Sequence, residues 1–138
     1  MIWGVFMSTF NNLEEARDFF KGDRFATKNS MVLDELGDDY AKCSVILNED
    51  HLNAYGGVMG GVIFTLADFA FAAASNNVHR PTVAQQVSIN FLSSTKGKKL
   101  IAIAKCKKNG KTSAIYNIDV VDDLGREIAQ FIGTGYKL

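Results

Sequence analysis

Proline, cysteine and histidine are scarce in this chain of 138 residues, which has one proline, two cysteines and two histidines. A disulfide framework or a zinc site needs more cysteines at closer spacing than Cys43 and Cys106, so we expect free, buried thiols and no metal. Lys and Arg number 15, Asp and Glu also 15, and the formal net charge is +0. A chain without a global positive field is not expected to bind nucleic acid, and any phosphate contact must be local. Reduced thiols fit a cytoplasmic location.

Long hydrophobic runs are also missing. The longest apolar stretch, Gly60 to Ala74, contains Asp68 and is shorter than the roughly 20 residues of a membrane span, so no membrane partner is expected. The opening residues, MIWGVFM, are too few for the apolar core of a signal peptide and lack a basic flank. Met7 begins a more typical opening, so residues 1–6 are interpreted as an N-terminal extension. The length suits a single domain over residues 1–138.

Local patterns predict two helices and a series of strands. Asn12 provides a helix cap, and apolar residues at helical spacing follow it as far as Gly22. Asn109-Gly110 is the strongest hairpin signal in the chain. The expected helices cover residues 13–20 and 60–76, and the expected strands cover residues 32–36, 40–47, 83–92, 100–107, 113–121 and 127–136.

The second helix is apolar almost all round, which is typical of a buried helix. An antiparallel sheet has one face to bury, and this helix is the element available to cover it. The simplest packing curves the sheet around the helix. The sequence therefore predicts an α+β protein with a curved antiparallel sheet wrapped around a long central helix, which is the description of a hotdog fold.

Asp68 is the one ionisable side chain between Gly60 and Val78. Burying a carboxylate without partners is costly, and no Lys or Arg lies within a turn or two to pair with it. One interpretation is structural: Asp68 faces a solvent gap or binds a backbone group. The other interpretation is functional, with Asp68 as a carboxylate at a cleft whose pKa is set by the site.

Glycine pairs, Gly56-Gly57 and Gly60-Gly61, bracket the start of the same helix. Free N–H groups at a helix N-terminus bind developing negative charge, and glycine lets a ligand approach the backbone closely. Gly60 and Asp68 are eight residues apart, which is about 12 Å along a helix, so both cannot reach one carbonyl within one subunit. If both act on it, the active site lies at a dimer interface.

Residues 51–76 read HLNAYGGVMGGVIFTLADFAFAAASN. This segment resembles the phenylacetate-pathway (PaaI-type) branch of the hotdog acyl-CoA thioesterases, within the 4-hydroxybenzoyl-CoA thioesterase-like family, which reads HxNxxGxxHGGxxFxLADxAFxxAxN. Downstream segments are similar too, and the resemblance covers nearly the whole chain past residue 30. It implies hydrolysis of an acyl-CoA thioester, no cofactor beyond the coenzyme A of the substrate, and a homodimer with a continuous sheet that often pairs into a homotetramer.

The resemblance also implies roles for three residues. Asp68 would be the nucleophile or the general base that activates water, and both alternatives remain open. The backbone N–H of Gly60 would polarise the thioester carbonyl, and Asn53 would help to orient the carbonyl or the attacking water. Met59 departs from the pattern because the family has His at this position, and we expect altered rate or specificity rather than no activity.

Seven residues are candidates for substrate contact. His51 keeps its family position, although it could also simply fix its loop. One of Gln85 and Gln86 is expected to face the acyl pocket. Lysines at strand ends belong by default to solvated turns, and otherwise contact the coenzyme A phosphates. The candidates are Gly61, Met59, His51, Gln85, Gln86, Lys96 and Lys98.

Two other functions compete with thioester hydrolysis. A non-catalytic acyl-CoA binder would keep the pocket but would not need Asp68. A hotdog hydratase or dehydratase pairs a carboxylate with a His near the central helix, and Met59 occupies the natural position for that His.

Overall fold

The computed structural model describes residues 8–138, and the proposed N-terminal extension, residues 1–6, lies outside the described residues. Both expected helices and all six expected strands are present, with ends within two residues of the predicted ones; a short helix, α2, and a 3-10 turn, η1, were not predicted. The helical elements are α1 (Leu13–Phe20), α2 (Arg24–Lys28), η1 (Glu49–His51) and α3 (Gly60–Val78). The strands are β1 (Met31–Leu36), β2 (Tyr40–Ile46), β3 (Thr82–Phe91), β4 (Lys99–Asn109), β5 (Ser113–Asp122) and β6 (Glu127–Lys137).

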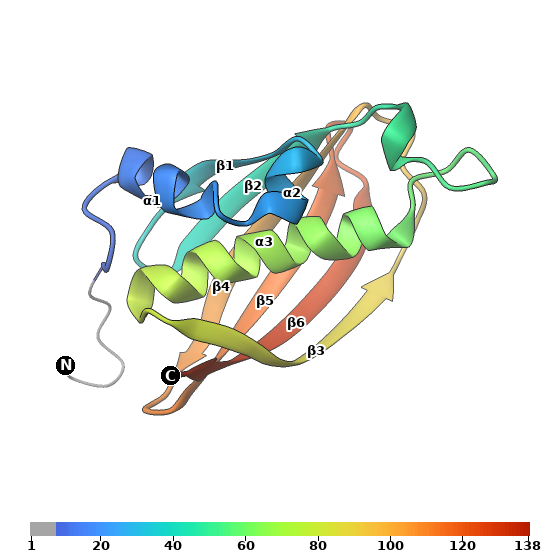
Figure 1. Cartoon of the computed structure of the whole chain (residues 1–138). Helices are drawn as coiled ribbons and strands as arrows, with labels where there is room; N and C mark the ends of the chain where they lie inside the picture. Colours follow the sequence, from blue (N-terminus) through green and yellow to red (C-terminus); the bar gives the residue numbers. More distant parts are fainter. Residues whose placement is uncertain (1–7) are drawn as a thin grey trace.

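The six strands form one antiparallel sheet in the order β1-β2-β4-β5-β6-β3. This sheet curves around α3, which crosses its concave face from the end of β2 to the start of β3 (Figure 1). The predicted α+β arrangement is therefore confirmed. Because β3 follows the helix directly but pairs only with β6, it forms one edge of the sheet.

Small residues on the concave face let α3 approach the sheet closely. Ala41, Ala102 and Ala104 face the helix and are fully buried. On β6, a Cβ atom added to Gly133 would lie 2.9 Å from Phe71 Cδ1, closer than real Cβ contacts allow. The ring of Phe71 thus occupies the space that the missing side chain leaves, and the core depends on glycine there.

Helix α3 runs to Val78, so it is longer than the apolar stretch seen in the sequence, and by length and composition alone it could cross a membrane. However, 67% of the 18-residue segment of α3 that is apolar enough to do so is buried inside the structure, as expected for a core helix. The residues that remain partly or fully accessible include Gly61, Thr65, Asp68 and Ala72. Their spacing of four, three and four places them on one face of the helix.

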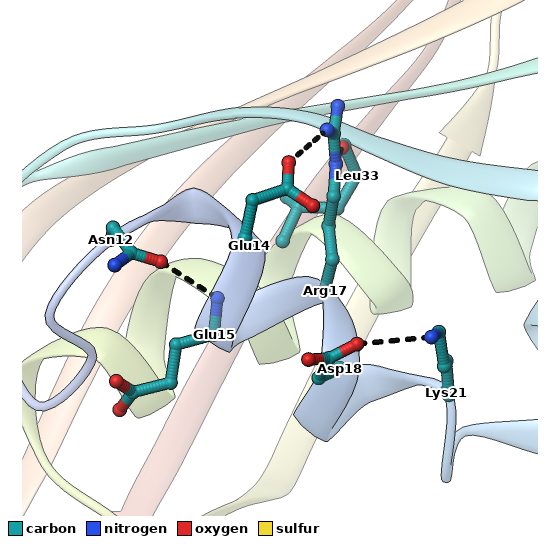
Figure 2. A network of polar contacts seen from close by, with 7 residues as sticks. All are labelled: Asn12, Glu14, Glu15, Arg17, Asp18, Lys21 and Leu33. Atoms are coloured by element: carbon teal, nitrogen blue, oxygen red, sulfur yellow. Dashed lines mark hydrogen bonds and ion pairs between the residues drawn. The ribbon is translucent and has the colours of Figure 1, made fainter.

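The N-terminal helices cover part of α3. Phe20 of α1 packs edge-on against Phe69 of α3, with ring centroids 6.0 Å apart. Asn12 caps α1 as predicted, because its side chain accepts a hydrogen bond from the N–H of Glu15 (Figure 2). Arg17 donates from Nε to the carbonyl of Leu33 at 2.8 Å, which fixes α1 to β1.

Both cysteines are free thiols. Cys43 is buried as expected, and burial raises the pKa of its thiol. Cys106 is only half buried, which differs from the expectation; it lies beside a bulge in β4.

Candidate active site

The loop before α3 is held in place by His51, which is 1% exposed. Nδ1 of His51 accepts a hydrogen bond from the N–H of Asn48 at 3.0 Å, so Nε2 carries the hydrogen and donates to the carbonyl of Asn29 at 2.9 Å. Both ring nitrogens are thus engaged by backbone groups. This differs from the expectation that His51 contacts the substrate: the ring fixes the loop, which was the other interpretation.

Asn53 organises the next turn of this loop. Its Oδ1 accepts hydrogen bonds from the N–H groups of Tyr55, at 2.9 Å, and Gly57, at 3.1 Å. Gly56 has φ +82, a left-handed conformation that favours glycine. Because Oδ1 is committed to the loop, the Nδ2 amide group is the part of Asn53 that remains to donate a hydrogen bond to a ligand.

The N-terminus of α3 carries free backbone donors. The N–H of Met59 donates to the carbonyl of His51 at 2.9 Å, which connects the helix to the loop. Within residues 8–138 no acceptor is bonded to the N–H of Gly60 or Gly61. These are the first helical residues, where donors have no partner within the helix and the helix dipole adds positive charge.

A pocket of about 380 Å³ opens at this helix end. Asn53, Gly57 and Gly60 form its polar side, and Phe91, at the end of β3, lies across from Gly60: a Cβ added to Gly60 would be 3.3 Å from Phe91 Cζ. The other lining residues are Val58, Ile63, Leu92, Ser93, Ser94, Thr95 and Ile128. An amide donor, a free helix N–H and an apolar wall suit a polar group joined to an apolar one, such as a carbonyl with its attached chain.

Asp68 lines a different pocket, of about 300 Å³, together with Phe64, Thr65 and Phe69 of α3 and residues Asp23 to Ala26. Its side chain is partly buried, and among the described residues it makes no hydrogen bond and no ion pair. Burial raises the pKa of Asp68, and the negative charge of Asp23 raises it further. A partly buried carboxylate without a partner, in a pocket and with a raised pKa, has the properties of a general base or nucleophile.

Gly60 and Asp68 line different pockets, as expected from the distance between them along α3. No residue lines both of them. We call the pocket with Gly60 and Asn53 the donor half of the candidate site, and the pocket with Asp68 its carboxylate half.

The remaining candidate residues lie around these halves. Met59 caps α3 and is 52% exposed, but it lines neither pocket. Gln85 and Gln86 are exposed at a bulge in β3 and line no described pocket, so the expectation that one of them faces the acyl pocket is not met within a single copy. Lys98 lines a third pocket, of about 260 Å³, whereas Lys96 lines none of the three.

The sequence did not reveal the residues that tertiary packing brings to the site. Phe91 was assigned to a strand and to a segment that resembles the family, but not to the site, and its position opposite Gly60 follows from the register of β3. Asp23 was not singled out, because nothing in its neighbourhood indicates that α2 lies beside α3. Among residues 8–138, no three or more His, Cys, Asp or Glu side chains are arranged to hold a metal ion.

Comparison with known proteins places this geometry in a family. The model of the Thioesterase superfamily matches residues 55–129. A protein of Archaeoglobus fulgidus named "Putative esterase" is 36% identical over 129 residues, which cover 91% of this chain and 83% of that protein. Acyl-coenzyme A thioesterase PaaI of Escherichia coli is 27% identical over 126 residues, covering 91% of this chain and 90% of that protein.

Solved structures agree with the observed fold. The structure of the E. coli PaaI protein superimposes with a TM-score of 0.83, 27% identity, and coverage of 89% of this chain and 90% of that chain. The Streptococcus mutans protein smu.793, solved bound to acetyl CoA, superimposes with a TM-score of 0.73 and 27% identity over 77% of this chain and 86% of that chain. The expected hotdog fold is therefore confirmed.

Proposed function

This chain belongs to the thioesterase superfamily, and from that premise we propose that it hydrolyses acyl-CoA thioesters at a site shared by two copies of the chain. One observation carries the proposal. A single helix holds a free N–H at Gly60 and an unpartnered carboxylate at Asp68, about 12 Å further along, and the two open into separate pockets.

The chemistry needs both halves. The N–H of Gly60 donates to the thioester carbonyl and stabilises the oxyanion that forms when the carbonyl carbon is attacked. In one route Asp68 takes a proton from water while the water oxygen bonds to the carbonyl carbon; the intermediate then collapses, the C–S bond breaks, and the proton passes to the departing sulfur. In the other route the Asp68 carboxylate attacks directly, coenzyme A leaves, and water hydrolyses the mixed anhydride.

Two features support a second copy as the source of the missing half. The edge strand β3 has ten residues, most of them exposed, and its outer edge is free to pair with the same strand of a partner. A second copy related by a two-fold axis would bring two donor halves to two carboxylate halves. We propose a homodimer with two such sites, and a homotetramer as its further assembly.

Coenzyme A would lie along the surface that leads away from Gly60. The donor pocket and the pocket beside Lys98 share Gly57, Val58 and Thr95 in their linings, so the two pockets lie next to each other. Lys98, with Lys96 nearby in sequence, could neutralise phosphate groups there. The acetyl CoA bound to the S. mutans protein supports this ligand class. The proposed reaction needs no cofactor beyond the coenzyme A of the substrate, and its proposed location is the cytoplasm.

The first test is release of free thiol from a panel of acyl-CoA thioesters by the wild-type protein and Asp68→Asn. The asparagine keeps the shape of the side chain but can neither take the proton nor attack, so we expect kcat to fall at least about 100-fold. Equal turnover by both proteins would contradict the role of Asp68. Binding of acyl-CoA by the wild type without thiol release would favour the acyl-CoA binder.

The donor role of Gly60 can be tested with two variants that both add a Cβ at this position. Gly60→Pro removes the N–H at the first helical position, where proline is tolerated, and Met59 before it already has the extended backbone that proline requires. Gly60→Ala adds a Cβ against Phe91 but keeps the N–H. We expect the proline variant to lose about 100-fold or more in kcat and the alanine variant to lose much less. Equal losses would mean that bulk, and not the N–H, matters.

Mixing two inactive variants tests the shared site. Dimers of Asp68→Asn alone and of Gly60→Pro alone lack a complete site, whereas a mixed dimer contains one site with both native groups. Statistical reassembly should restore about a quarter of wild-type activity. No recovery, with mixed dimers verified by mass, would place the whole site within one subunit.

A further inference from the structure

The carboxylate half of the site contains a second acid, Asp23. Asp23 lies between α1 and α2 and lines the same pocket as Asp68, so two acids far apart in the sequence share one pocket. Arg24 and Phe25 follow on α2, and Phe64 and Thr65 on α3 complete the polar and apolar walls.

The Asp23 side chain does not make the capping hydrogen bond that is usual at its position. It is the N-cap residue of α2, where Asp is favoured because its carboxylate accepts a hydrogen bond from the first turn. Here the side chain makes no such bond. The carboxyl group is desolvated although the residue as a whole is exposed, and this desolvation raises its pKa.

Within residues 8–138, neither of the two acids forms an ion pair. Arg24 lines the pocket, but it is exposed and forms no ion pair with Asp68 or Asp23. The charges of α1 pair with one another, Glu14 with Arg17 at 2.8 Å and Asp18 with Lys21 at 2.9 Å (Figure 2). Several ionisable side chains of the sheet lie on its concave face, and none of them lines this pocket; they are Cys43, Cys106, Tyr116, Asp122 and Lys137.

We propose that Asp23 is a positioning residue for the proposed reaction, and that its negative charge, in the pocket it shares with Asp68, makes the Asp68 carboxylate a stronger base. The inference rests on the proposed function, because it concerns the activity of Asp68. A more basic carboxylate accepts a proton from water more readily in the transition state.

The electrostatics give the direction of the effect. Burial is the first cause of the raised pKa of Asp68, and the charge of Asp23 is the second. Asp68 acts in its deprotonated form, so activity is lost as the pH falls through this pKa. Removing the Asp23 charge lowers the pKa of Asp68 and therefore moves the acid limb of the pH profile to lower pH.

The test compares three variants in kcat/KM against pH, on an acyl-CoA that the wild type hydrolyses. Asp23→Asn removes the charge and suits the N-cap position. Asp23→Glu keeps the charge. Asp18→Asn is the matched control, because Asp18 belongs to an exposed ion pair on α1. A ¹³C NMR titration of the Asp68 carboxyl in each protein measures the same effect without turnover.

We expect the acid limb and the NMR titration of Asp68 to move to lower pH in Asp23→Asn, and to stay near wild type in Asp23→Glu and Asp18→Asn. The plateau of Asp23→Asn should fall by less than about tenfold, since Asp23 transfers no proton itself. If the acid limb of the pH profile and the titration of Asp68 were unchanged in Asp23→Asn while Asp68→Asn was inactive, this inference would be overturned and the proposed function would stand. Full activity of Asp68→Asn would instead overturn the proposed function.

Discussion

Nε2 of His51 lies 2.9 Å from the backbone oxygen of Asn29, so a buried ring connects the loop before α3 to the residue that ends α2. The same ring accepts from the N–H of Asn48. Both halves of the proposed site are therefore linked through one side chain. Arg24 of α2 and Asp23, the N-cap residue before it, line the pocket of Asp68, and the loop carries Asn53, which lines the pocket of Gly60.

His51→Ala should destabilise the protein. The substitution leaves two backbone groups without partners and opens a cavity, and we expect the free energy of unfolding to fall by about 2–4 kcal/mol. Urea unfolding followed by circular dichroism measures this. His79→Ala is the control, since His79 is half buried and bonds the carbonyl of the terminal Leu138, and should cost less than about 1 kcal/mol. Unchanged stability in His51→Ala with lost activity would return His51 to the list of substrate contacts.

Gly133→Ala should be destabilising because the added methyl group would be too close to the ring of Phe71. The new Cβ would lie 2.9 Å and 3.1 Å from two atoms of Phe71 and 3.2 Å from Phe131. Overpacking of this kind costs about 1–3 kcal/mol. Phe71→Leu removes part of the ring, so the double variant should be more stable than the sum of the two single effects predicts. Additive effects in this thermodynamic cycle would show that Phe71 is not the group that excludes the methyl.

Asp68 should lower stability at neutral pH. Its pKa is raised in the folded state by burial and by Asp23, so the folded state holds this proton more tightly than the unfolded state does. Stability therefore falls as pH rises from the ordinary pKa of Asp through the raised one. Asp68→Asn should unfold at higher urea than wild type at pH 7, and the difference should vanish in acid. Asp119→Asn, an exposed change on β5, should show no such pattern; a less stable Asp68→Asn at pH 7 would contradict the argument.

The strands, the central helix and the position of Asp68 at a cleft could be predicted because each depends on a local pattern. Alternating residues give β4, β5 and β6, and a run of apolar residues with one acid gives α3 and its carboxylate. The eight-residue separation of Gly60 and Asp68 indicated that both cannot reach one carbonyl within one subunit, and the two residues line different pockets; the active site at a dimer interface stays a prediction.

The residues that the sequence did not reveal depend on contacts between distant segments. α2 has five residues and no side-chain cap, so it gives almost no local signal, and its place beside α3 brings Asp23 to the site. The role of His51 depends on Asn29, 22 residues away. Phe91 faces Gly60 only because β3 pairs with β6 in one register. Periodicity within a segment carries no information about such pairings.

Substitutions of Asn53 can separate its role in holding the loop from its proposed role in the reaction. Its Oδ1 holds the N–H groups of Tyr55 and Gly57, while Nδ2 is the group left to donate to substrate or water. Asn53→Asp keeps an acceptor in the same place and removes the donor. We expect this variant to unfold within about 0.5 kcal/mol of wild type and to lose at least about tenfold in kcat, because an oxyanion then faces a carboxylate instead of an amide.

Asn53→Ala removes both the acceptor and the donor, so stability and activity should fall together, by about 1–2 kcal/mol for the two lost hydrogen bonds. Asn117→Asp adds the same charge to the exposed face of β5 and serves as the control for net charge. If Asn53→Asp kept full kcat, the amide would have no part in the reaction, and Asn53 would act only through the shape of its loop. If Asn53→Asp lost as much stability as Asn53→Ala, the carboxylate would not replace the amide oxygen as an acceptor, and the expected stability of Asn53→Asp would be wrong.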